Sequence, residues 1–159
     1  MSEQPNLKFL LDNPAHLLAL GFGSGLARKA PGTFGSAAAL PFWLMIASMP
    51  QAYQLSLIVL AFIVGILICD TTGKALGVHD HGAIVWDEFV GLWIVLYFAP
   101  GGWIWLLLGF GLFRVFDILK PWPIRAIDRS MRGGLGVMLD DVLAGLMAAG
   151  VIVLLARFI

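Results

Sequence analysis

Three long stretches without a single charged residue dominate this chain. They cover residues 30–69, 89–113 and 142–156, and the first is too long to be one helix across a membrane. Pro50 divides the first stretch and Pro100 divides the second, so we expect two helical hairpins followed by one further helix. Hydrophobic residues make up 60% of the chain and charged residues 13%, about half of what a soluble domain carries. The chain is therefore predicted to lie in a membrane.

The predicted fold is all-α, a polytopic membrane helical bundle in which residues 1–159 form a single domain. About five spans are expected, at 34–49, 53–70, 84–99, 102–119 and 139–158, with an interfacial N-terminal helix over about 14–21. Each apolar leg is shorter than the roughly 20 residues that a perpendicular span needs, so we expect the helices to extend into the polar segments beside them. The segment Met1–Pro14 lacks the features of a signal peptide and is interpreted as mature cytosolic chain.

The charged residues gather at one end of the predicted helices. Both hairpin tips are uncharged, and Arg157 is the one basic residue on the tip side. The positive-inside rule places the charged end in the cytoplasm. The net charge of zero gives no reason to expect nucleic acid as a partner, and the single cysteine, Cys69, excludes an internal disulfide.

Two acidic pairs, Asp87-Glu88 and Asp140-Asp141, each fall where an apolar helix is expected to begin, with Asp117 on a third helix. Acidic residues in a first turn can simply cap free N–H groups and complement the helix dipole. However, carboxylates clustered near the hydrocarbon boundary repel one another and lose hydration. A divalent cation relieves both costs, and Mg²⁺ prefers carboxylate oxygen and keeps waters that can attack phosphorus.

A second candidate is the segment around Arg114, Asp117 and Lys120, which are spaced at i, i+3 and i+6 on roughly one helix face. One interpretation is an ion-pair ladder whose long side chains reach the membrane interface. The other is phosphate recognition by the arginine fork and the lysine charge.

The glycine-rich region 21–36 and the loop at 79–82 allow weaker predictions. Thr33 is either the N-cap of a helix or part of an anion-binding nest that includes Ser36. Asp80 and His81 lie in a short polar loop that could supply a metal ligand or a general acid, and a plain surface loop explains them equally well. No covalent nucleophile fits a known arrangement, so phosphoryl chemistry here would use metal-activated water.

Six motifs in this order resemble the phosphatidylglycerophosphatase A family, and the resemblance covers about residues 13–145. They are GFGSGL at 21–26, APGTFGS at 30–36, VHDHG at 78–82, IVWDEFVG at 84–91, FRVFDILKPWPIR at 113–125 and GGLGVMLDDVLAG at 133–145. The resemblance implies magnesium-dependent hydrolysis of the terminal phosphate of phosphatidylglycerophosphate at the bacterial inner membrane. Together with the apolar stretches and the charge pattern, it predicts a multi-pass protein whose active site faces the cytoplasm.

The resemblance implies roles for the acidic pairs, for Asp80 and for Arg114, Asp117 and Lys120. The residue patterns described above add His81, Thr33 and Ser36, and all of these roles are expectations. Asp87, Glu88, Asp140 and Asp141 are expected to bind Mg²⁺; Asp87, Glu88, Asp80 and His81 to take part in catalysis; and Arg114, Lys120, Thr33 and Ser36 to bind the substrate phosphate, with Asp117 as an additional candidate. The expected partners are the phospholipid substrate and membrane lipids, and a homo-oligomer is compatible with the sequence. Two alternatives are a small membrane ion transporter and another magnesium-dependent lipid headgroup enzyme.

Overall fold

The computed structural model describes residues 4–158, and every regular element in that range is helical. The elements are α1 (Leu7–Asp12), α2 (Pro14–Ala19), the short 3-10 helix η1 (Gly21–Leu26), α3 (Pro31–Ile46), α4 (Gln51–Leu76), α5 (Trp86–Phe98), α6 (Trp103–Leu119), α7 (Ile124–Ser130) and α8 (Gly133–Leu155). The all-α prediction is therefore confirmed for the described part of the chain.

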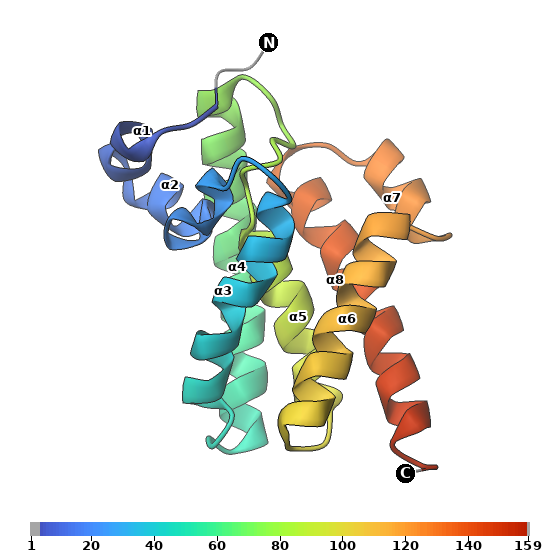
Figure 1. The fold of residues 1–159 in the computed structure, drawn as a ribbon. Coiled ribbons are helices and arrows are strands. Elements are labelled where there is room, and N and C mark those ends of the chain that lie inside the picture. The colour runs from blue at the N-terminus through green and yellow to red at the C-terminus, as the bar shows by residue number, and fades with distance from the viewer. Residues whose placement is uncertain (1–3, 159) are drawn as a thin grey trace.

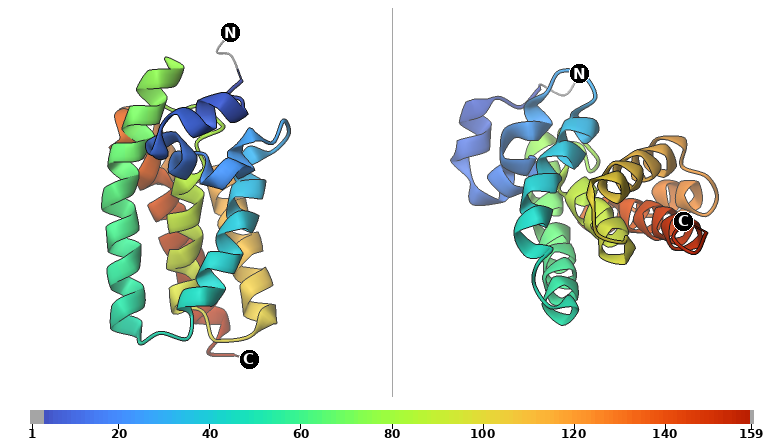
Figure 2. Two further views of the ribbon diagram at one scale, coloured as in Figure 1. Left: turned by 90° about the vertical axis from the view of Figure 1, so that its left-hand side faces the viewer. Right: turned by 60° about the horizontal axis from the view of Figure 1, so that its bottom comes forward.

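Five long helices, α3, α4, α5, α6 and α8, run alongside one another and alternate in direction (Figure 1). The α3–α4 and α5–α6 turns lie at the same end of the bundle, as the positions of Pro50 and Pro100 predicted. Figure 2 shows α5 enclosed by its neighbours, and every residue of α5 from Trp86 to Leu96 is buried. The central helix thus carries Asp87 and Glu88 into the interior.

Five complete membrane spans are not established by this structure. Among residues 4–158, two helices, α4 and α8, are long and apolar enough to cross a membrane. By contrast, α5 has 13 residues and rises about 20 Å, well short of a hydrocarbon core of about 30 Å. The buried segment before Trp86 and the turn at Pro100 limit its length.

Glycines let α8 approach two helices at backbone distance. A Cβ atom on Gly145 would lie 2.5 Å from the carbonyl oxygen of Gly91 in α5, and one on Gly134 would lie 1.9 Å from that of Ile66 in α4. Small residues at such crossings allow close helix packing without large side chains between the backbones. The two crossings fix α8 against α5 and α4 on either side of its acidic pair.

The connections contain helices that the sequence patterns did not predict. The predicted interfacial helix corresponds to α2, but α1 precedes it in the segment interpreted as a polar tail, and α7 lies between α6 and α8. The side chain of Asn6 caps α1 by accepting from the Phe9 N–H at 3.0 Å. Both additional helices have six or seven residues, too few for a clear hydrophobic period.

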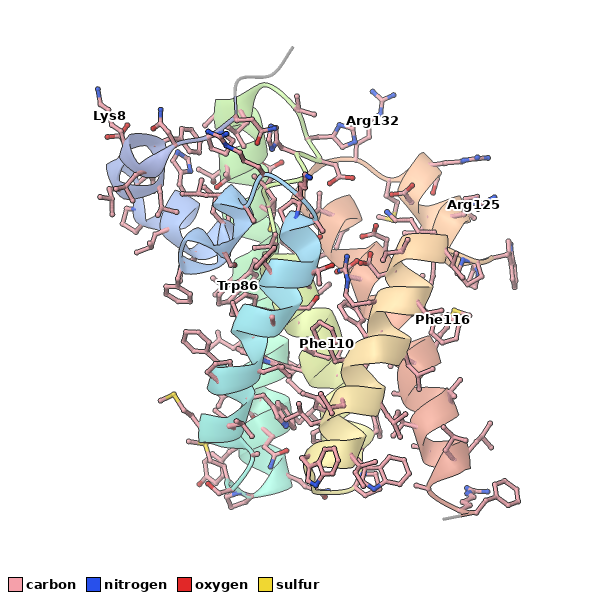
Figure 3. All side chains as sticks on the ribbon, in the orientation of Figure 1. Lys8, Trp86, Phe110, Phe116, Arg125 and Arg132 are labelled. Atoms are coloured by element: carbon pink, nitrogen blue, oxygen red, sulfur yellow. The ribbon has the colours of Figure 1, made fainter. Side chains whose placement is uncertain are left out.

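Charge and apolar surface separate along the bundle. Lys8, Arg125 and Arg132 mark the end that also carries α1, α2 and α7, opposite the two hairpin turns (Figure 3). The outer faces of α4 and α6 are exposed and apolar over much of their length, through Val59, Leu60, Ile63 and Leu67 on α4 and Ile104, Leu107, Val115 and Ile118 on α6. Exposed apolar area of this extent marks a surface that contacts lipid or another protein.

Candidate active site

Three buried carboxylates from two helices meet near the charged end of the bundle. Asp87 and Glu88 lie in the first turn of α5, and Asp141 comes from α8. One ligand oxygen of each lies within 4.8 Å of the other two, and each residue is at most 8% exposed. We call these three residues the carboxylate cluster.

The carboxylate cluster contains oxygens that form no hydrogen bond within the described residues. Asp87 Oδ1, Glu88 Oε2 and Asp141 Oδ2 are buried without a hydrogen-bond partner among the described residues. Neither member of the α5 pair makes a side-chain cap bond to that helix. Asp141 cannot be a first-turn residue, because α8 begins at Gly133 and not near residue 139 as predicted. Helix capping therefore does not explain these side chains.

Arg114 of α6 is the cation closest to the carboxylate cluster. Its Nη1 lies 3.7 Å from Glu88 Oε1, forms an ion pair with Asp117 and donates to Ser36 Oγ at 3.4 Å. Its buried Nε has no hydrogen-bond partner within residues 4–158. Gly32 makes room for this contact, since a Cβ there would lie 2.3 Å from Glu88 Oε1 and 3.0 Å from Arg114 Nη2. The sequence prediction missed this role of Gly32, because nothing in the Pro-Gly-Thr segment indicates it.

Lys120 belongs to a neighbouring ionic group. Its Nζ lies 2.6 Å from Asp140 Oδ2 and 2.6 Å from Asp128 Oδ1 of α7. Burial alone lowers the pKa of Lys120, but its hydrogen bonds to Asp128 and Asp140 outweigh burial and raise that pKa above its ordinary value. The prediction that Lys120 shares a helix face with Arg114 is wrong, because α6 ends at Leu119 and Lys120 turns toward α7 and α8.

Asp80 and His81 belong to neither of these two groups. Asp80 is exposed in the α4–α5 connection, close enough to interact electrostatically with Asp87 and Asp140. His81 is buried, and its Nδ1 accepts a hydrogen bond from the Ala83 N–H at 3.1 Å. Any proton that this ring can donate therefore sits on Nε2.

Ser36 and Thr33 of α3 differ in their relation to the site. Ser36 is buried, donates to the Gly32 carbonyl oxygen at 2.9 Å and contacts Arg114. Thr33 is partly buried and does not cap α3, because Ala30 occupies the N-cap position. The Thr33 N–H donates to the Ala30 carbonyl oxygen at 2.9 Å, which leaves it less available to an anion.

The donor set fits a hard divalent cation. The carboxylate cluster, together with Asp117 and Asp140, holds five carboxylates against the two cations Arg114 and Lys120. Buried charge of one sign is costly unless it is paired or coordinates a metal. The unpartnered oxygens of the cluster are the type of ligand that Mg²⁺ prefers. Asp140 is committed to Lys120, so the structure groups Asp87, Glu88 and Asp141 but not all four predicted ligands.

Comparison with known proteins shows to which class of protein this chain is similar. Two curated relatives are both phosphatases. Phosphatidylglycerophosphatase A of Escherichia coli K12 is 51% identical to this chain, over 89% of this chain and 83% of the relative. Phosphatidylglycerophosphatase A of Haemophilus influenzae is 50% identical, over 93% of this chain and 92% of the relative. The family model described as phosphatidylglycerophosphatase A matches residues 17–156, and the chain belongs to this family.

A third relative is more distant. A provisionally named phosphatidylinositol-3-phosphatase of Bacteroides thetaiotaomicron is 36% identical over 90% of this chain and 93% of its own. No solved structure matches the chain. All three relatives are named for removing a phosphate from a lipid headgroup, which agrees with a buried anionic site beside an arginine at the charged end of a bundle.

Proposed function

We propose that this protein hydrolyses the terminal phosphomonoester of phosphatidylglycerophosphate to phosphatidylglycerol and inorganic phosphate. The observation that carries the proposal is the carboxylate cluster beside Arg114, in which one buried oxygen of each residue has no partner among residues 4–158. The names of the two relatives at about 50% identity supply the substrate.

Arg114 is the residue best placed to bind the phosphoryl group. Its guanidinium contacts both Glu88 and Asp117, and those two contacts hold it in position. Its Nε has no partner among the described residues. A planar guanidinium can bind two oxygens of one phosphate. Lys120 supplies a second, compact positive charge, which Asp128 and Asp140 hold in place.

Asp87, Glu88 and Asp141 would hold Mg²⁺, with Asp140 beside them. When bound, this ion would stabilise negative charge on the phosphoryl oxygens and lower the pKa of a coordinated water. Asp80 and the Nε2 of His81, both in the α4–α5 connection, are the groups proposed to deliver a proton to the departing alcohol.

The protein is proposed to span the bacterial inner membrane with its active site facing the cytoplasm. The apolar length of α4 and α8 and the exposed apolar faces of α4 and α6 support membrane insertion. The basic residues at the end that carries the site support this orientation through the positive-inside rule. In this arrangement the shorter helices α3, α5 and α6 complete a five-helix bundle and reach only part of the bilayer depth.

The test is phosphate release by the purified protein in a neutral detergent. Phosphatidylglycerophosphate with Mg²⁺ should give inorganic phosphate and phosphatidylglycerol, and excess EDTA should abolish turnover. No release with Mg²⁺ present would refute the substrate assignment, and full turnover after verified metal removal would refute the metal role. Phosphatidylinositol 3-phosphate is the second substrate to assay, because the third relative is named for it.

A further inference from the structure

We propose that a basic pocket beside α7 binds the second, phosphodiester phosphate of the substrate headgroup and so selects lipids that carry two phosphates. The inference rests on the proposed function, since phosphatidylglycerophosphate has a terminal phosphomonoester and an internal phosphodiester. The pocket has a volume of about 320 Å³ and is lined by Lys120, Pro121, Trp122, Arg125, Ala126 and Arg129. We call it the α7 pocket.

The α7 pocket carries positive charge that the protein does not neutralise. Arg125 and Arg129 are four residues apart, so they lie on one face of α7, and both are exposed. Neither forms an ion pair with a carboxylate of residues 4–158, and Arg125 Nη2 donates only to the Leu119 carbonyl oxygen, at 3.4 Å. Figure 3 shows Arg125 projecting outward from α7 at the charged end. Two unpaired guanidinium groups around one cavity favour an anionic ligand.

Lys120 connects the α7 pocket to the carboxylate cluster. It lines the pocket, while its Nζ lies 2.6 Å from Asp140, the residue that precedes Asp141 of the cluster. The two phosphates of the substrate are joined by a three-carbon glycerol. A headgroup that lies across Lys120 can therefore place its terminal phosphate at the cluster and its phosphodiester between the arginines.

The surface next to the α7 pocket suits the rest of the lipid. Trp122 is 82% exposed at the rim, and an indole ring of this kind is favoured at the headgroup level of a bilayer. Ile118 and Leu119, also exposed, continue the apolar outer face of α6 away from the pocket. The acyl chains would follow this face into the membrane, which places the phosphodiester at the pocket itself.

The test compares two lipids in neutral detergent micelles, where no anionic surface is present. Phosphatidic acid has a terminal phosphomonoester but no phosphodiester. The double variant Arg125→Gln/Arg129→Gln should raise the KM for phosphatidylglycerophosphate by at least about tenfold more than the KM for phosphatidic acid. The matched control is Lys8→Gln/Arg132→Gln, which removes two exposed positive charges from the same end outside the pocket and should not change the ratio.

Inhibition by phosphatidylglycerol gives a second readout, because this product keeps only the phosphodiester. Its inhibition constant should rise about tenfold in the pocket variant and stay unchanged in the control. Equal KM increases for both substrates, an unchanged inhibition constant, or the same effect in the control would overturn the inference. Wild-type turnover tests the proposed function by itself, whereas the ratio between variants tests the α7 pocket.

Discussion

Asp141→Asn separates a metal site from a structural role more sharply than any other change at the carboxylate cluster. The substitution keeps the shape of the side chain and removes one negative charge. Asp141 is 2% exposed, and its Oδ2 has no hydrogen-bond partner in the described part of the chain. Ligand oxygens of Asp87 and Glu88 lie within 4.8 Å of its own. Two unit charges at that distance repel each other by about 3–4 kcal/mol at an effective dielectric constant of about 20. Without metal, the variant should therefore unfold no earlier than the wild type.

With metal the expected order reverses. Mg²⁺ at a hundred times its dissociation constant stabilises the folded state by about 2.7 kcal/mol, which raises the Tm of a chain of this size by about 5–10 °C. If loss of an anionic ligand weakens Mg²⁺ binding about a hundredfold, the same Mg²⁺ concentration stabilises the folded variant by only about 0.4 kcal/mol. This raises the Tm of the variant by about 1 °C. Turnover should fall by about a hundredfold or more, since the bound water also becomes less acidic.

The assay is thermal unfolding in detergent, with EDTA or with a Mg²⁺ titration, alongside phosphate release. Asp12→Asn is the matched control, because Asp12 is exposed on α1 and far along the chain from the cluster. Glu88→Gln should behave like Asp141→Asn. A full Mg²⁺-induced shift and near-normal turnover in both cluster variants would refute the metal assignment, because an amide cannot replace a carboxylate as an anionic ligand.

Three further predictions test other parts of the structure. Lys120→Met should lower kcat/KM about tenfold to a hundredfold, whereas Lys8→Met should leave it near the wild-type value; equal small effects would deny Lys120 a phosphate role. Cys69→Ser should keep activity within a few fold, because the thiol is buried in the core, and a large loss of turnover in folded protein would indicate thiolate chemistry. Gly145→Ala should destabilise the protein by about 1–3 kcal/mol, since its methyl carbon would lie 2.5 Å from a carbonyl oxygen of α5, while Gly150→Ala, with open space around it, should not; similar Tm values would contradict the close crossing.

The sequence by itself determined the helical architecture and the end of the bundle where the charged residues lie. Charge-free apolar stretches can satisfy their backbone in a membrane only as helices or closed barrels, and the absence of alternation left helices. Pro50 and Pro100 then fixed the two turns. The short helices α1 and α7 escaped prediction because six or seven residues are too few to show a hydrophobic period. Tertiary contacts stabilise helices this short, and in α1 the Asn6 cap contributes as well.

Only the tertiary structure decided which acidic residues lie together. Neighbouring residues on a helix point about 100° apart, so Asp140 turns toward Lys120 while Asp141 turns toward Asp87 and Glu88. The spacing of a pair along the chain cannot reveal this difference, because it depends on which helices pack on each side of α8. Likewise, the sequence predicted Lys120 on a helix face. In the structure α6 ends at Leu119, so Lys120 turns to Asp128 and lines the α7 pocket.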